Sequence, residues 1–221
     1  MATWLTHLRI AASIKERVKA IDLGYLMMGS IAPDSGEPDE DVLKYIPSKD
    51  ITHNVYVRPD NSKDIDDRAF FSKYLEPEKI FARSDKTRSF LWGYYFHLLT
   101  DKLWLEQHFR MYYDSYRQGT DAGEKEAVDF IREEMYSLDF EYLKQHGNEL
   151  INIFEQSNAN VDFFSEFDVE YIYRNKNRIL DFYKGQPVVL QRPYRFLSAE
   201  AVDGFISKAS ESCVNILIYG A

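Results

Sequence analysis

The first residues of the chain carry apolar side chains at a spacing that is typical of an amphipathic helix. The positions between residues 3 and 22 that fall on its apolar face are Trp4, Leu8, Ala11, Ile14, Val18 and Ile21. Thr3 is a suitable N-terminal cap, and His7 lies on the apolar side of the predicted helix. A short apolar segment follows and ends in Ala-Pro-Asp-Ser-Gly, a sequence that predicts a turn at Asp34.

The segment from residue 37 to residue 88 is polar and is interrupted by four prolines. This pattern predicts a long ordered loop with short helical pieces at residues 66–74 and 77–81. A loop of this length within a compact domain is uncommon unless it serves a function. His53 lies in this loop.

The segment 88–117 contains no proline, is rich in aromatic residues, and predicts a long helix. The residues that share one of its faces are Gly93, His97, Asp101, Trp104 and His108. The remaining predicted helices are 123–136, 138–156, 161–184 and 198–217, and the one extended segment is 185–193. We therefore expect an all-α fold with a single multi-helix domain over residues 1–221, in which residues 1–118 carry the chemistry and residues 119–221 complete the helical body.

The composition is that of a globular protein, with 45% hydrophobic and 29% charged residues. A net charge of −9 argues against tight binding of nucleic acid, which relies on Lys and Arg contacts to phosphate. The single cysteine, Cys213, excludes an internal disulfide and suits a reducing compartment. The N-terminal segment is too charged for a signal peptide, and no apolar run is long enough to span a bilayer. We expect a cytoplasmic protein without a transmembrane segment.

His97 and Asp101 form the strongest chemical motif. Their spacing of four places both side chains on one helix face, within reach of one cation. Neutral imidazole and carboxylate are both good zinc ligands. Because the surrounding sequence is apolar, a buried Asp101 needs a partner. A buried hydrogen-bonded pair that only joins two helices is the alternative interpretation.

The other three candidates are unremarkable when each is taken alone. A single histidine on an apolar helix face, such as His7, is more often a core residue than a ligand. Asp34 occupies an ordinary turn sequence, and His53 would normally be exposed in a loop.

The order of these residues resembles a known family. The runs are Thr-Trp-Leu-Thr-His-Leu-Arg-Ile-Ala, Gly-Ser-Ile-Ala-Pro-Asp-Ser, Ile-Thr-His and Gly-Tyr-Tyr-Phe-His-Leu-Leu-Thr-Asp. In this order they resemble the zinc-dependent phospholipase C family, which includes bacterial phosphatidylcholine-cleaving enzymes and single-strand-specific zinc nucleases. The resemblance covers residues 2–110. It implies a helical fold that holds zinc ions in a cleft and hydrolyses phosphodiesters.

The resemblance also implies a role for each candidate. His7 would bind one zinc ion together with the N-terminus of the chain, and Asp101 would bridge two ions. His53 and His97 would be imidazole ligands of the same pair. Asp34 would contact the metals and the attacking water, as a metal ligand and as the catalytic carboxylate.

This chain departs from the family in two respects. Secreted members begin with a processed Trp that chelates zinc, whereas Trp4 is internal here; removal of Met1 would leave Ala2 five residues before His7. The candidates for a further zinc site are His108, His146 and Glu149, but their spacings differ from the pattern of the family.

We therefore expect a zinc-dependent phosphoester hydrolase that acts on a small phosphorylated or phospholipid-like substrate through a metal-activated water. Two zinc ions are expected. The alternative is a non-catalytic helical protein with a remnant or structural metal site. A di-iron bundle ranks last because the chain has no Glu-x-x-His motif. The sequence does not choose among the arginines that could contact a phosphate, Arg58, Arg68 and Arg88.

Overall fold

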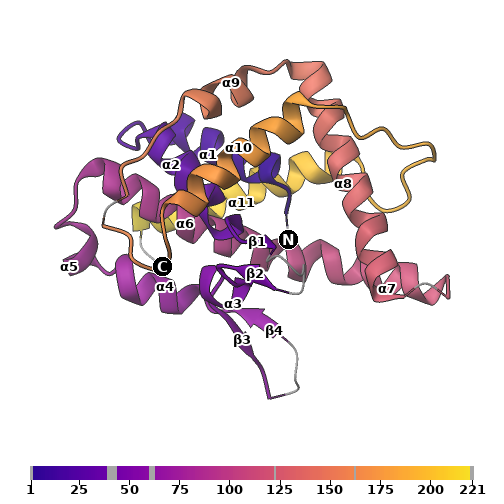
Figure 1. The fold of residues 1–221 in the computed structure, drawn as a ribbon, viewed down its shortest axis with the longest axis horizontal. Helices are drawn as coiled ribbons and strands as arrows, with labels where there is room; N and C mark the ends of the chain where they lie inside the picture. Colours follow the sequence, from indigo (N-terminus) through magenta and orange to yellow (C-terminus); the bar gives the residue numbers. More distant parts are fainter. Residues whose placement is uncertain (1, 39–43, 60–62, 122, 162, 220–221) are drawn as a thin grey trace.

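Helices form most of the chain in the computed structural model, which describes residues 2–38, 44–59, 63–121, 123–161 and 163–219. The α-helices are α1 (Trp4–Arg17), α2 (Leu23–Ile31), α3 (Lys49–Thr52), α4 (Asp67–Tyr74), α5 (Pro77–Ile80), α6 (Asp85–Trp104), α7 (Arg110–Gln118), α8 (Glu124–His146), α9 (Glu149–Gln156), α10 (Glu170–Lys184) and α11 (Ala199–Tyr219). A 3₁₀ turn covers Ala32–Asp34, and a π-helical turn covers Leu105–Phe109 between α6 and α7. The predicted all-α fold in one domain is confirmed (Figure 1).

Helices α2 and α6 pack against each other at backbone distance. A Cβ atom built on Gly29 of α2 would lie 2.1 Å from the carbonyl oxygen of Phe90 in α6. A Cβ atom on Gly93 of α6 would lie 2.2 Å from the carbonyl oxygen of Leu26 in α2. Both glycines are therefore required by the close approach. The sequence places Gly93 one turn before His97, so this contact also fixes where His97 sits.

Helix α1 packs against α2 and α11, and its apolar face contributes to a single core. Thr3 caps the helix by accepting a hydrogen bond from the Thr6 amide. The predicted helix over residues 3–22 is too long, because α1 ends at Arg17. Asp22 is instead the N-cap of α2, where its carboxylate accepts from the Tyr25 amide at 3.0 Å. The segment that follows, predicted only as apolar, is therefore helical.

The predicted boundary between helices at residue 137 is wrong. Helix α8 continues to His146 and ends at Gly147, which has a φ of +77° and closes the helix. The predicted helix over 161–184 starts late, at Glu170, and the carboxylate of Asp168 accepts a hydrogen bond from the Glu170 amide at 2.9 Å. The prediction over 198–217 is confirmed by α11.

The segment 37–88 contains the two predicted short helices, α4 and α5, and two hairpins that the sequence pattern did not indicate. Strands β1 (Glu37–Pro38) and β2 (Tyr45–Ile46) form one antiparallel pair, and β3 (Val55–Val57) and β4 (Lys63–Ile65) form the other. The β3–β4 hairpin projects from the bottom of the molecule in Figure 1. Helix α3 lies between the hairpins and ends at His53.

The connection from α10 to α11 forms no strand, so the extended segment predicted at residues 185–193 does not join a sheet. The buried Glu134 of α8 anchors its second half by accepting hydrogen bonds from the amides of Arg195, Phe196 and Leu197. Among the described residues, no helix has both the length and the apolar character that crossing a bilayer would require.

Candidate metal centre

All five of the predicted ligands converge on one buried point. Helix α1 supplies His7, the 3₁₀ turn after α2 supplies Asp34, and the end of α3 supplies His53. Helix α6 supplies both His97 and Asp101, one turn apart. The three imidazoles and Asp101 are buried, whereas the side chain of Asp34 is 11% exposed.

The reactive atoms of these side chains lie at similar distances from one another. Nε2 of His97 lies 3.2 Å from Nε2 of His53 and 3.4 Å from Oδ2 of Asp101. Nε2 of His53 lies 3.6 Å from Oδ2 of Asp101 and 3.5 Å from Oδ1 of Asp34. The two sets of ligand atoms close enough to hold an ion are His7 with His97 and Asp101, and Asp34 with His53 and His97.

The two carboxylate oxygens of Asp101 face different neighbours. Oδ2 faces the nitrogens of His53 and His97. Oδ1 lies 3.4 Å from Nε2 of His7 and accepts a hydrogen bond from the backbone nitrogen of Ala2 at 2.8 Å. Asp101 therefore sits between two groups of ligand atoms, as a carboxylate that bridges two ions would.

Two hydrogen bonds fix the orientation of the imidazoles. Nδ1 of His97 lies 2.7 Å from the carbonyl oxygen of Ser30, which can only accept, so this nitrogen carries the proton and Nε2 presents a lone pair. Nδ1 of His53 lies 2.9 Å from the hydroxyl of Thr52. Such bonds from the far nitrogen are typical of metal-binding histidines. The ring of His7 stacks on that of His97 at 3.9 Å.

Burial and mutual attraction set the protonation states. Burial lowers the pKa of His7 and that of His53, and both remain below the ordinary value although nearby carboxylates oppose the shift. Burial would raise the pKa of Asp101, but attraction to His97 and hydrogen bonds hold it well below the usual range. Burial would also raise the pKa of Asp34, but the hydrogen bond to His53 and the attraction to His97 and His53 outweigh it, so the pKa is lowered. Burial also disfavours a charged His97, but Asp101 outweighs it and raises the pKa.

Zinc fits this donor set on two observations. Two ligand atoms on a tetrahedral zinc ion with bonds of about 2.0–2.1 Å lie roughly 3.3 Å apart. The separations between the nitrogens of His53 and His97 and Oδ2 of Asp101 range from 3.2 to 3.6 Å. Moreover, Nε2 of His7 and Oδ2 of Asp101 are buried without a hydrogen-bond partner among the described residues. Such atoms are costly to bury unless something else satisfies them.

The candidates for a further zinc site do not meet. His108 packs on Trp104 and Phe205, with Nδ1 3.2 Å from the hydroxyl of Tyr112. His146 lies exposed at the end of α8, bonded to the carbonyl oxygen of Tyr142, and Glu149 is also exposed. Among the described residues, neither belongs to a set that could hold an ion with His108.

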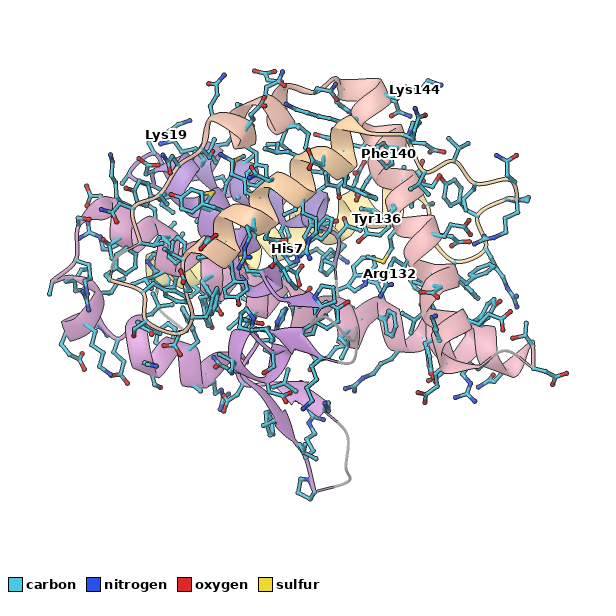
Figure 2. The ribbon with its side chains drawn as sticks, in the orientation of Figure 1. His7, Lys19, Arg132, Tyr136, Phe140 and Lys144 are labelled. Carbon is cyan, nitrogen blue, oxygen red and sulfur yellow. The ribbon has the colours of Figure 1, made fainter. Side chains whose placement is uncertain are left out.

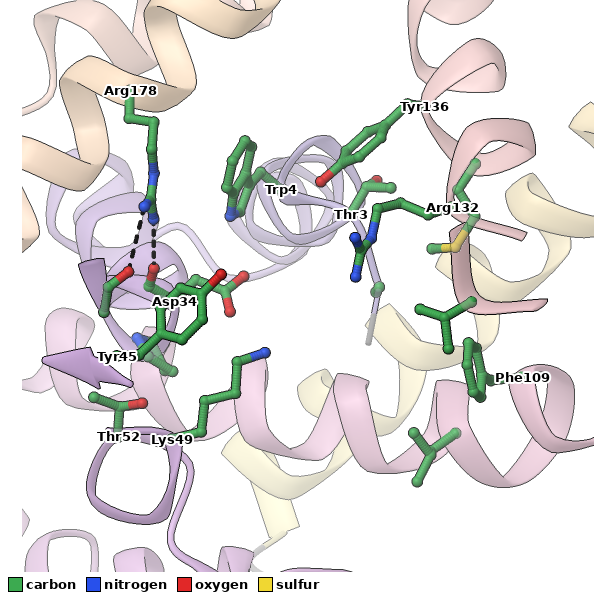
Figure 3. Close-up of a pocket in the computed structure, with 16 residues that line it drawn as sticks. Thr3, Trp4, Asp34, Tyr45, Lys49, Thr52, Phe109, Arg132, Tyr136 and Arg178 are labelled. Carbon is green, nitrogen blue, oxygen red and sulfur yellow. Dashed lines mark hydrogen bonds between the residues drawn. The ribbon is translucent and has the colours of Figure 1, made fainter. Parts of the chain in front are cut away.

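A cleft of about 670 Å³ opens beside Asp34 and Ala2 (Figure 3). The side chains that line it and that the sequence analysis did not select include three cations, Lys49, Arg132 and Arg178. Figure 2 shows Arg132 and Tyr136 projecting from α8 toward the centre of the molecule. On amphipathic helices, such residues look like ordinary surface positions, so no signal in the sequence selects them.

Arg178 holds the turn that carries Asp34. Its guanidinium donates to the carbonyl oxygens of Asp34 at 2.9 Å and Gly36 at 3.3 Å (Figure 3). It also donates to the side chain of Asn175 at 2.6 Å. Asn175 in turn donates to the carbonyl oxygen of Ile31 at 2.9 Å. Helix α10 therefore positions the turn through two of its side chains.

The three arginines considered from the sequence lie outside the cleft. Arg58 pairs with Asp64 of the β3–β4 hairpin, and Arg88 pairs with Asp85 at the start of α6. Neither these two nor Arg68 lines the cleft.

The fold and the site together define a helical protein with a buried histidine and carboxylate centre beside a cleft. Comparison with models of known protein families, with curated proteins and with solved structures finds no match.

Proposed function

We propose that the chain is a zinc-dependent hydrolase of a phosphoester, a phosphodiester or a phospholipid-like substrate, with His7, Asp34, His53, His97 and Asp101 as its ligands. One observation carries the proposal: residues that are far apart in the sequence bring their ligand atoms to separations of 3.2–3.6 Å around one buried point. That spacing fits a zinc ion, and two of the ligand atoms, Nε2 of His7 and Oδ2 of Asp101, have no hydrogen-bond partner in the described part of the chain.

Two ions fit the arrangement better than one. His97 has a single nitrogen left for a metal, because its Nδ1 is bonded to Ser30. One ion would take Asp34, His53 and His97, and Oδ2 of Asp101 faces the nitrogens of the same two histidines. A second would take His7 and Oδ1 of Asp101. The backbone nitrogen of Ala2 donates to this Oδ1, and we infer that removal of Met1 would turn it into the N-terminal amine that the resemblance implies as a further ligand.

Asp34 is the residue that faces both the centre and the cleft. Its carboxylate lies near His53 and lines the cleft, and its lowered pKa keeps it ionised. It can therefore accept a hydrogen bond from a water molecule and orient that water for attack. Paired zinc ions, when bound, lower the pKa of that water toward neutrality and stabilise negative charge on a phosphoryl oxygen. Thr52, Ser30 and Arg178 keep the imidazoles and the turn of Asp34 in place.

The proposal is tested by metal analysis of the purified protein followed by hydrolysis of bis(p-nitrophenyl) phosphate. We expect close to two zinc ions per chain and turnover that a chelator abolishes. Asp34→Asn should retain most of the zinc, because four ligands remain, and should lower kcat by about 100-fold or more. The control is Asp181→Asn, which changes an exposed carboxylate on α10 and should leave both values unchanged.

Two results would contradict the proposal in different ways. If the protein binds no zinc under any loading condition, the proposal loses its basis. A protein that binds zinc but turns over no phosphoester, with Asp34→Asn indistinguishable from the unmodified chain, supports the alternative of a structural metal site.

A further inference from the structure

The cleft beside the candidate centre carries more positive charge than the rest of the protein would suggest. Its lining includes three cations, Lys49, Arg132 and Arg178, and one carboxylate, Asp34. The chain as a whole has a net charge of −9.

Lys49 and Arg132 reach into the cleft from opposite walls. Lys49 is the first residue of α3, whereas Arg132 lies on α8. In Figure 3 both side chains extend into the space between Asp34 and Phe109. The guanidinium of Arg132 makes an ion pair with Asp129 one turn earlier, at 3.3 Å, and this pair is exposed to solvent. An exposed pair of this kind is weak, so Arg132 can exchange it for a ligand.

Arg178 adds a positive charge that neutral groups hold in place. Among the described residues, the acceptors of its guanidinium are the backbone oxygens of Asp34 and Gly36 and the amide oxygen of Asn175. Its guanidinium carbon lies 5.5 Å from the ring centre of Trp4. These partners orient the charge without neutralising it. The cleft therefore combines Arg178, which is held beside the turn of Asp34, with Lys49 and Arg132 on its opposite walls.

The far end of the cleft is apolar. Leu105 and Phe109 line it from the π-helical turn, and Val128 and Met135 line it from α8. The hydroxyl of Tyr136 lies between the two ends (Figure 3). Burial raises the pKa of Tyr136 to about 12, so the phenol stays protonated and can donate a hydrogen bond. A ligand that suits these walls has an anionic end and an apolar end.

We propose that the cleft selects a phosphoester with a second negative charge close to the reacting phosphate and an apolar group beyond it, and that Lys49 and Arg132 determine this preference. The inference rests on the proposed function, because the cleft adjoins the same centre. A dianionic phosphomonoester and a phosphodiester with a neighbouring anion both satisfy the charge requirement. Trp4, Tyr45 and Tyr136 could attract a quaternary ammonium group through their rings, but three full positive charges in the same cleft oppose it.

Binding measured by isothermal titration calorimetry provides the first test. The probes are phenyl phosphate, which is mostly dianionic at pH 7.5, methyl phenyl phosphate, which has one charge, and phosphorylcholine, whose ammonium offsets one charge. The zinc-loaded protein should bind phenyl phosphate at least about tenfold more tightly than either of the others. Lys49→Gln and Arg132→Gln should each weaken phenyl phosphate by about fivefold and methyl phenyl phosphate by less than about twofold.

The matched control is Lys144→Gln. Lys144 is an exposed lysine on α8, three turns beyond Arg132, and it does not line the cleft (Figure 2). This variant should bind all three probes like the unmodified protein. If Lys49→Gln and Arg132→Gln weaken the three probes equally, or if phosphorylcholine binds most tightly, the inference is wrong.

Kinetics separates this inference from the proposed function. With zinc loaded, p-nitrophenyl phosphate should exceed p-nitrophenyl phosphorylcholine in kcat/KM, and the two variants should reduce that ratio. Turnover of every ester with no preference among them overturns the inference and leaves the hydrolase proposal intact. Absence of all turnover overturns the hydrolase proposal, and calorimetry still decides the binding preference. A competition experiment shows whether the natural anion is soluble or part of a lipid: phenyl phosphate competes with vesicles of phosphatidylcholine that contain phosphatidic acid. Tighter binding of either anion than of pure phosphatidylcholine vesicles supports the inference.

Discussion

At the scale of single residues, Asp139 is a buried carboxylate that forms no ion pair with any of the residues that the structure describes. It accepts hydrogen bonds from the hydroxyls of Thr3 at 3.0 Å and Tyr183 at 2.7 Å. The Tyr183 oxygen also accepts from the amide of Leu5 at 3.0 Å. Asp139 therefore ties the start of α1 to α8 and α10, close to the candidate metal centre. Burial raises its pKa to about 7, although these hydrogen bonds oppose the shift.

The raised pKa predicts a pH-dependent loss of stability. In the unfolded chain an Asp titrates near pH 3.9, so between about pH 4 and pH 7 the folded protein retains a proton that the unfolded chain has released. The free energy of unfolding should therefore fall as the pH rises through this interval, by about 1.4 kcal/mol for each pKa unit of difference. Asp139→Asn should remove this component, because an amide stays neutral and can still bond to Thr3 and Tyr183.

The measurement is urea unfolding at several pH values for the unmodified chain and for Asp139→Asn. The difference between their curves of unfolding free energy against pH separates the contribution of Asp139 from that of the histidines. Asp181→Asn, which changes an exposed carboxylate, provides the control and should follow the unmodified chain. Parallel curves for Asp139→Asn and the unmodified chain would show that Asp139 is ionised in the folded state.

Among the candidate ligands, only the pair His97 and Asp101 could be predicted as neighbours from spacing alone, because a helix places residues four apart on one face. His53 looks exposed in the sequence, yet it is buried, because α3 and the hairpins fold its loop against α6. Its proximity to His97 was available only from the resemblance. The cations Lys49, Arg132 and Arg178 were missed, since their grouping depends on the packing of three helices that are distant in sequence.

At the scale of elements, the close contact between α2 and α6 predicts that a single methyl group added there strongly destabilises the fold. Gly93→Ala places a Cβ atom against the backbone of Leu26, which cannot rotate away. We expect a loss of about 3 kcal/mol in the free energy of unfolding, at the upper end for overpacking. Since Ser30 of α2 accepts from His97, separating the helices should also weaken zinc binding.

The control for this variant is Gly204→Ala, within α11. A Cβ atom there meets nothing within 4 Å, so the substitution should raise the free energy of unfolding by about 0.5–1 kcal/mol. Chemical denaturation measures both changes. Equal stability of the two variants would mean that α2 and α6 can separate at no cost.

Elements with strong local signals were predicted well, and those defined by pairing were not. The N-cap at Ser198 and the apolar period that follows predicted α11. By contrast, the strands of the β1–β2 and β3–β4 hairpins are two or three residues long, too short for an alternating pattern. The break predicted at residue 137 had no glycine or proline to cause it, whereas Gly147 ends α8.

At the scale of the whole molecule, the candidate centre joins α1, the turn after α2, α3 and α6. A metal that binds only the folded chain stabilises it by about 4 kcal/mol at a concentration 1,000 times its Kd. For a protein of this size, that corresponds to a rise in Tm of about 10 °C. Scanning calorimetry should therefore show that Tm falls by about this amount when EDTA removes zinc. Added zinc should restore the Tm, whereas magnesium should not.

Asp101→Asn is the matched variant for this experiment, because it removes the charge that both ligand groups share. It should unfold at the same temperature with and without zinc. A Tm of the unmodified chain that does not respond to EDTA, in protein shown to contain zinc beforehand, would contradict a role of the metal in joining these elements.

The reciprocal fit of Gly29 and Gly93 restricts how the protein can vary. The atoms that an added methyl group would strike are main-chain carbonyls, so no exchange of a neighbouring side chain can make room for it. Most side chains along the cleft have no such constraint, since they end in its open space; Gly36 is an exception, because a Cβ atom added to it would lie 2.6 Å from the carbonyl oxygen of Pro47. Under random mutagenesis with selection for new substrates, the walls of the cleft should accumulate changes, whereas both of these glycine codons should persist.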